Sequence, residues 1–136
     1  MNERTRAYFD DLAERAIAAE PVPRKIYCEA QPNACHTNCE TFVQRFPGFE
    51  VVRGWQVLGG CWFIPHSVVR AASGTMIDIT PEAGNSAIPF VEHRGTELEF
   101  AILRQGRDGG WLYPPLTLET GNFGCTESTQ PNQTVI

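Results

Sequence analysis

The 136-residue sequence has no cluster of basic residues and no long apolar stretch. It contains 11 Lys and Arg against 16 Asp and Glu, which gives a net charge of -5 at pH 7. Proteins that bind nucleic acid present clustered Lys and Arg to the phosphates, so nucleic acid is not an expected partner. The longest apolar stretches are far shorter than the ~20 residues that cross a bilayer, so no membrane partner or lipid anchor is expected either.

The start of the chain is charged and lacks the apolar region of a secretory signal, which predicts a cytoplasmic protein, with export by a route that leaves no such mark as the alternative. The five cysteines are odd in number and their spacings match no disulfide framework, so most are expected to be free thiols. They also lack the paired C-x2-C spacing of a typical zinc site, and no metal or cofactor is predicted. A structural zinc site stays open as an alternative, with candidate ligands Cys28, Cys35, His36, Cys39 and Cys61.

The length fits a single domain over residues 1–136, with its core at about 24–104 and a mostly irregular segment over 105–136. Apolar residues at helical spacing predict two N-terminal helices, and runs rich in Val, Ile, Phe and Trp predict an antiparallel meander. We therefore expect an α+β fold in which the helices pack on an antiparallel sheet. The helices are predicted at 3–19 and 34–46, the strands at 49–58, 61–70 and 75–80, a further strand at 87–93, and either a helix or a strand at 96–103.

The chain contains three candidate catalytic residues in the order Cys35, His66 and Asp78. Cys35 lies within one turn of the start of the second predicted helix, whether Asn33 caps that helix or Thr37 begins a capping box. Backbone amides and the helix dipole favour a thiolate at such a position. His66 and Asp78 lie on successive strands, which is the arrangement of a thiol nucleophile, its general base and the group that orients the base.

Alternation along the two strands places His66 and Asp78 on the same face of the sheet. A three-residue turn would pair Val69 with Thr75 and put His66 directly opposite Asp78, whereas a longer turn would shift the pairing, so the register stays open. Directly opposed residues have Cβ atoms ~4.5 to 5.5 Å apart, which suits a hydrogen bond between a histidine and a carboxylate.

Residues 31 to 81 resemble the papain-like superfamily of cysteine enzymes, most closely its transglutaminase-like branch. The segment HSVVRAASGTMIDITP is similar to that branch's paired strands, of which the first carries His and the second ends in Asp. Small bacterial proteins with a Cys-His pair and an Asp-x-Thr-Pro end are also similar. The resemblance implies a papain-like or transglutaminase-like fold, and it implies that Gln31, just upstream of the cysteine, donates to the oxyanion. Ser67 stands where the family often has Trp, so the substrate class does not carry over.

Three further cysteine and histidine residues are expected to have structural roles and not catalytic ones. Cys39 is expected in the core, His36 on a different helical face from Cys35, and His93 at the surface. The leading hypothesis is acyl transfer or hydrolysis on an amide of a protein or peptide, by deamidation, peptide hydrolysis or transamidation. A non-catalytic binding or immunity-type module of the same fold is the main alternative. The sequence does not define the oligomeric state.

Overall fold

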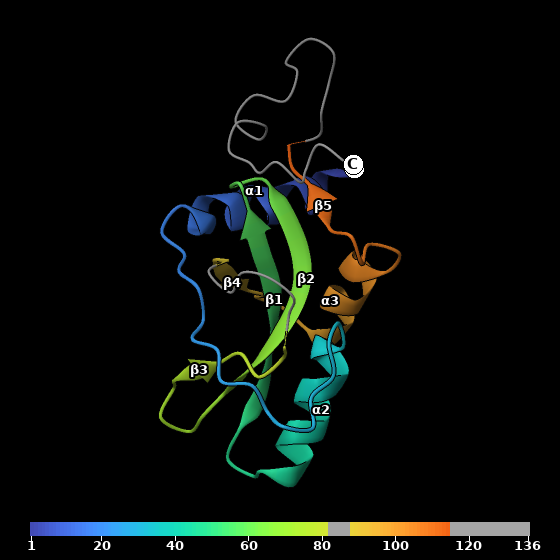
Figure 1. The fold of residues 1–136 in the computed structure, drawn as a ribbon. Helices are drawn as coiled ribbons and strands as arrows, with labels where there is room; N and C mark the ends of the chain where they lie inside the picture. Colours follow the sequence, from blue (N-terminus) through green and yellow to red (C-terminus); the bar gives the residue numbers. More distant parts are fainter. Residues whose placement is uncertain (82–87, 115–136) are drawn as a thin grey trace.

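The computed structural model describes residues 1–81 and 88–114, and within them three helices pack against a curled antiparallel sheet, as the α+β prediction requires (Figure 1). The helices are α1 (Glu3–Ala16), α2 (Cys35–Arg45) and α3 (Glu97–Arg104). The strands are β1 (Glu50–Leu58), β2 (Trp62–Arg70), β3 (Met76–Ile77), β4 (Phe90–Glu92) and β5 (Trp111–Leu112). The predicted helices and the three-strand meander are confirmed, and the ambiguous segment 96–103 is helical.

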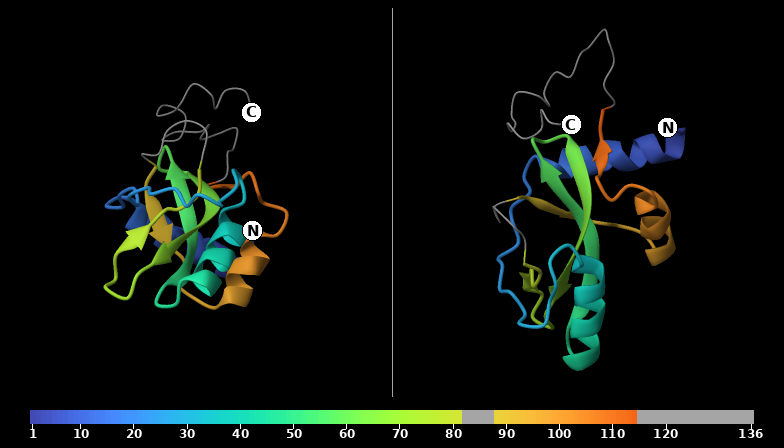
Figure 2. Two further views of the ribbon diagram at one scale, coloured as in Figure 1. Left: turned by 60° about the horizontal axis from the view of Figure 1, so that its bottom comes forward. Right: turned by 45° about the vertical axis from the view of Figure 1, so that its right-hand side comes forward.

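The long β1–β2 hairpin forms the centre of the sheet, with β3 and β5 beside β2 and β4 beside β1. β5 pairs with Trp62 and Phe63, whereas β3 pairs with Val69 and Arg70. Within the described part of the chain, residues 64–68 of β2 therefore have no strand partner on that edge. Helices α2 and α3 lie on the same side of the hairpin, and α1 crosses one end of it (Figures 1 and 2).

The register between β2 and β3 differs from the predicted one. Val69 pairs with Ile77, two positions further along than expected, because the connection spans residues 71–75. His66 is therefore not directly opposite Asp78. A shift by an even number of residues leaves each side chain on its original face, so the two residues remain diagonal neighbours.

The main hydrophobic cluster forms where α1 packs on the hairpin. Phe9 and Leu12 of α1 are fully buried against Trp55 and Phe63, and Tyr113 belongs to the same cluster. The core thus includes residues on both sides of the expected range 24–104. Burial of these large side chains stabilises the fold by ~1.5 to 3 kcal/mol each relative to exposure.

The three helices begin differently. The side chain of Asn2 caps α1, and Thr96 and Glu99 form a capping box at the start of α3. The N-cap of α2 is Ala34, which offers no side-chain hydrogen bond. Asn33, one of the predicted caps, has a left-handed φ of 59°, outside the extended region that a capping residue adopts.

The C-terminal segment is described only as far as residue 114. β5 occupies part of the segment predicted to be irregular, while Phe123 and the rest of 115–136 lie outside the described residues. In the ranges 1–81 and 88–114, no helix has the length and apolar character needed to cross a bilayer.

Candidate active site

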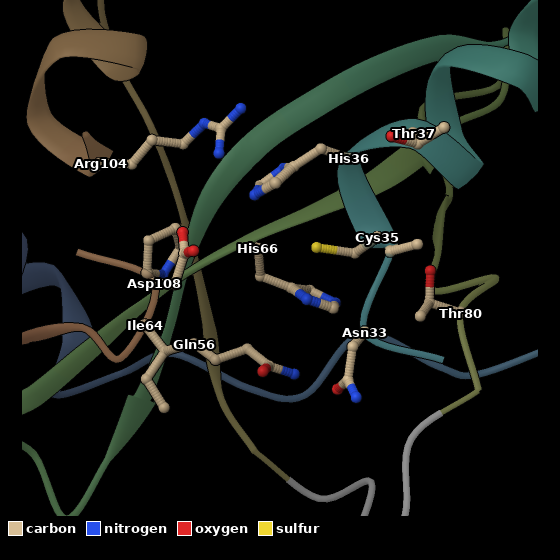
Figure 3. A pocket seen from close by; sticks show the side chains of 12 residues that line it. Asn33, Cys35, His36, Thr37, Gln56, Ile64, His66, Thr80, Arg104 and Asp108 are labelled. Atoms are coloured by element: carbon tan, nitrogen blue, oxygen red, sulfur yellow. The ribbon is translucent and has the colours of Figure 1, made fainter. Parts of the chain in front are cut away.

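The first turn of α2 lies beside residues 64–68 of β2, which in the described part of the chain have no strand partner on the edge away from β1, and a pocket of about 590 Å³ opens there (Figure 3). Cys35 is the first residue of α2, and His66 lies in the middle of this stretch of β2. The pocket is lined by Asn33, Ala34, Cys35, His36, Thr37, Gln56, Ile64, Pro65, His66, Thr80, Arg104 and Asp108. The structure therefore brings the predicted thiol and the predicted base to one cavity.

Asp78 completes the predicted group. His66 Nε2 lies 2.8 Å from Asp78 Oδ2, and both residues are buried, with 2% and 4% of their surface exposed. Because Nε2 faces the carboxylate, the other ring nitrogen, Nδ1, is left to face Cys35. The ring of Phe90 packs edge-on against His66 and occupies the space that a side chain at Gly54 would fill. His66 is thus held in position by a charge-assisted hydrogen bond and by an aromatic ring.

The carboxylate of Asp78 is itself fixed. Its Oδ1 accepts a hydrogen bond of 3.2 Å from the backbone N–H of Thr80, and its Oδ2 lies 3.9 Å from a guanidinium nitrogen of Arg24. The backbone of Asp78 also pairs with the segment that contains Arg24, since its N–H donates to Pro23 and its carbonyl accepts from Lys25. These contacts set the orientation of the carboxylate that orients the imidazole.

The Cys35 thiol hydrogen-bonds to two imidazoles, those of His36 and His66 (Figure 3). Burial alone would raise the pKa of Cys35, but hydrogen bonds from His36 and His66, together with the charge of His66, outweigh it and lower the pKa to about 6. Burial opposes protonation of His66, yet its bonds to Asp78 and Cys35 raise its pKa to about 10. Between these two values the site holds a thiolate beside an imidazolium, which is the reactive form of a cysteine nucleophile.

Asn38 is a site residue that the sequence analysis missed. It is buried one turn after Cys35, and its side chain accepts a hydrogen bond from the backbone N–H of Gln31 and donates to the Gln31 carbonyl. It also donates to Thr80 Oγ1 over 3.0 Å. Asn38 therefore joins the helix that carries the thiol to the segment that carries Asp78. Its position beside Cys39 on the apolar face of the helix was the available signal.

Gln31, the oxyanion donor that the resemblance implies, lies outside the pocket, whereas Gln56 lines it. Gln31 is exposed, its backbone is held by Asn38, and it does not line the pocket. Gln56 of β1 lines the pocket and is only 7% exposed. Its side-chain amide makes no hydrogen bond to any of the described residues, so this group is available to a substrate. A polar residue between Trp55 and Val57 in an apolar strand was the sequence signal for it.

Two histidines differ from their expected environments. His36 was expected on a different helical face from Cys35, but its ring reaches the thiol because side chains in the first turn of a helix lean toward the N-terminus. His93 was expected at the surface, yet it is buried and its Nδ1 lies 2.7 Å from the hydroxyl of Tyr8. A chain of polar contacts inside the core thus accounts for His93.

Within residues 1–81 and 88–114, the other cysteines do not form a metal site. Cys28 is exposed, Cys39 is fully buried in the core as predicted, and Cys61 is engaged in a disulfide. Burial raises the pKa of Cys39, which makes it a poor nucleophile. Among the residues that the structure describes, no group of three or more His, Cys, Asp or Glu side chains could hold a metal ion, so the ligands of the alternative zinc site do not converge.

Searches against protein-family models, curated proteins and solved structures find no match to this chain.

Proposed function

We propose that this protein is a cysteine-dependent acyl-transfer enzyme that acts on an amide, with Cys35 as nucleophile, His66 as general base and acid, and Asp78 as the residue that orients His66. The observation that carries the proposal is the buried His66–Asp78 pair at 2.8 Å, whose imidazole also hydrogen-bonds to the thiol at the start of α2. A single-domain fold of the papain-like or transglutaminase-like type is part of this proposal.

The reaction follows from these positions. The thiolate of Cys35 attacks the carbonyl carbon of the amide, and the carbonyl oxygen takes up the negative charge. His66, already protonated, gives its proton to the leaving nitrogen as the C–N bond breaks, which leaves a thioester on Cys35. Water or an amine then attacks the thioester, and His66 takes the proton of the attacking group. The thioester bond breaks, and the acyl product leaves as an acid or a new amide.

The charge on the oxygen needs hydrogen-bond donors. The first amides of an α-helix have no partner within the helix, and α2 has no side-chain cap to occupy them. The backbone N–H of Cys35 is therefore the main candidate donor. The buried amide of Gln56 offers the substrate both a donor and an acceptor, which fits the peptide or carboxamide groups of a protein or peptide substrate.

Location in the cytoplasm remains a prediction from the sequence. The free thiols of Cys28, Cys35 and Cys39 fit a reducing compartment, whereas the disulfide at Cys61 is of the kind that oxidising compartments maintain. Nucleic acid and membranes are not proposed as partners.

The test is labelling by a peptide probe that carries a chloroacetyl group in place of the glutamine carboxamide. The expected result is stoichiometric modification of Cys35, mapped by mass spectrometry, with loss of labelling in Cys35→Ser. Labelling should fall at least tenfold in Asp78→Asn and remain unchanged in the matched control Cys28→Ser. Ammonia release from glutamine peptides, compared with incorporation of a fluorescent amine, then separates deamidation from transamidation.

Equal labelling of Cys28 and Cys35, unaffected by Asp78→Asn, would contradict the enzyme proposal. The pocket would then belong to a binding module that retains the arrangement without the chemistry.

A further inference from the structure

The roles proposed for Cys35, His66 and Asp78 do not account for a second imidazole ring at the thiol. Figure 3 shows the Cys35 sulfur between the rings of His36 and His66, and the thiol hydrogen-bonds to both. The two rings are held by different partners. Asp78 holds His66, whereas Nδ1 of His36 lies 2.6 Å from Ser67 Oγ.

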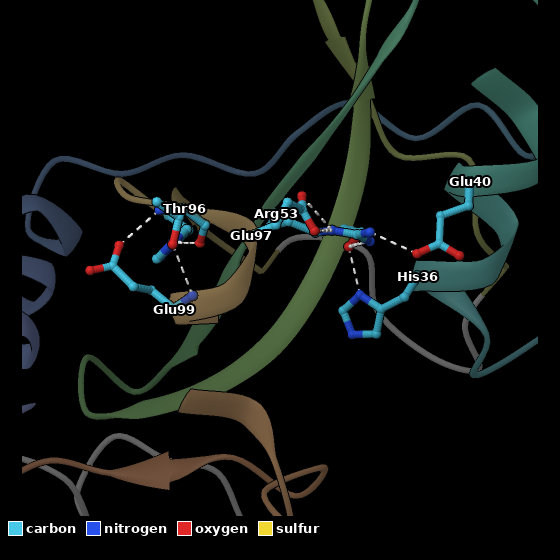
Figure 4. Close-up of polar contacts among 8 residues, drawn as sticks. His36, Glu40, Arg53, Thr96, Glu97 and Glu99 are labelled. Carbon is cyan, nitrogen blue, oxygen red and sulfur yellow. Dashed lines mark hydrogen bonds and ion pairs between the residues drawn. The ribbon is translucent and has the colours of Figure 1, made fainter. Parts of the chain in front are cut away.

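The hydroxyl of Ser67 is fixed by Arg53. These two residues are directly opposed across β1 and β2, and Arg53 Nη1 donates to Ser67 Oγ over 3.0 Å. Arg53 is anchored in turn by two carboxylates, Glu40 of α2 at 2.7 Å and Glu97 of α3 at 3.2 Å (Figure 4). The side chain of Arg53 is 13% exposed, so this arrangement is largely enclosed.

This chain of contacts favours one tautomer of His36. A guanidinium can only donate, so the oxygen of Ser67 accepts from Arg53. Ser67 is fully buried, and His36 is its only other side-chain partner among the described residues, so Nδ1 of His36 is the side-chain acceptor within reach of the hydroxyl hydrogen of Ser67. When Ser67 donates to Nδ1, the imidazole carries its N–H on Nε2, the nitrogen that is left to face the thiol.

We propose that His36 is a second catalytic residue that donates an Nε2–H hydrogen bond to the Cys35 thiolate without exchanging a proton, and that Ser67 and Arg53 are the positioning residues that fix this tautomer. The inference rests on the proposed function, since it assumes Cys35 as nucleophile. It gives the two histidines separate tasks: His66, which Asp78 holds, exchanges the proton, whereas His36 donates a hydrogen bond to the thiolate.

The first test uses nitrogen NMR of the unmodified protein at neutral pH, which needs neither substrate nor a variant. The charged group beside the thiol is His66, which Asp78 holds from its far nitrogen, and Arg104 and Asp108 lie at the pocket wall. We expect a neutral His36 ring with its hydrogen on Nε2 beside a doubly protonated His66. A His36 ring that is protonated on Nδ1, alone or together with Nε2, would overturn the proposal.

The second test measures the pH midpoint of Cys35 alkylation by iodoacetamide. His36→Phe, which keeps a ring but removes the donor, should raise the midpoint by about one to two pH units, as expected for loss of a hydrogen bond to a charged group. His36→Gln, which returns an N–H near the Nε2 position, should reverse most of that shift. An unchanged midpoint in His36→Phe would contradict the proposal.

The positioning role of Ser67 has its own readout. Ser67→Ala should release the fixed tautomer of His36 in the nitrogen spectrum, whereas Ser73→Ala, in an exposed turn, should leave it unchanged. A fixed tautomer that persists in Ser67→Ala would overturn the role of Ser67. These measurements succeed or fail independently of turnover, so they remain informative if the amide-directed probe does not label Cys35.

Discussion

Replacement of His66 by Gln should change how the reactivity of Cys35 depends on pH, and the change has a calculable form. In the folded protein the pKa of Cys35 is about 6, against an ordinary value of 9.0. In His66→Gln, burial raises the pKa of Cys35 and the remaining hydrogen bond from His36 lowers it. If these two effects cancel and the pKa returns to the ordinary value, the thiolate fraction at pH 7 falls from about nine-tenths to about one-hundredth. At pH 5 the thiolate fraction of the native protein is about a thousandfold larger than that of the variant.

A thiolate of lower pKa is also a weaker nucleophile, with a Brønsted slope of about 0.4–0.5. The native thiolate, whose pKa is about three units lower, is therefore about twentyfold less reactive than the thiolate of the variant. Combining the two effects, His66→Gln should alkylate about 40-fold more slowly than the native protein at pH 5 and about fourfold more slowly at pH 7. At pH 9 the variant should be about tenfold faster. The two pH profiles are therefore expected to cross.

The assay is the rate of iodoacetamide labelling at Cys35, resolved by mass spectrometry from pH 5 to 9. The exposed thiol of Cys28 reacts in the same samples and serves as an internal control, since its rate should not respond to the substitution. Parallel profiles that never cross would refute the reasoning, because they would mean that His66 does not set the ionisation of Cys35.

Three further predictions concern the surroundings of the site. Gly54→Ala would place a Cβ 2.5 Å from the ring of Phe90, so it should lower the free energy of unfolding by about 1–3 kcal/mol, measured by urea denaturation. Tyr8→Phe removes the hydroxyl that accepts from Trp55 and contacts His93, and a lower thermal midpoint corresponding to about 1–3 kcal/mol is expected. A chelator should alter neither the thermal midpoint nor the labelling of Cys35, whereas a loss of either would support the zinc alternative.

The sequence predicted most of the fold because its signals were local. Helical spacing defined α1 and α2, and strand alternation placed Val69 and Ile77 on a different face from His66, in agreement with their cluster around Cys39. The register stayed open in the sequence because a turn's length depends on how its backbone closes, which residue types alone do not determine. The observed pairing differs by two residues from the one that a three-residue turn would give, so each side chain stays on its expected face.

The site was predicted less completely than the fold. His66 and Asp78 could be paired from strand order, and the structure places them in contact. Asn38, Gln56 and the approach of His36 to the thiol depend on tertiary contacts. None of these follows from a local pattern, because each requires knowing how α2 is set against β2.

The uncapped start of α2 carries a consequence for how this protein can be stabilised. A capping Ser or Asp at position 34 in place of Ala34 would ordinarily add about 0.5–2 kcal/mol. The same side-chain oxygen would accept from the backbone N–H of His36 or Thr37 and would lie in the pocket wall beside the N–H of Cys35, so the gain in stability would come with a loss of activity. Of the three helices described, the one that begins with Cys35 is the one without a side-chain cap. Selection for thermostability alone would therefore be expected to favour substitutions at Ala34 that weaken catalysis.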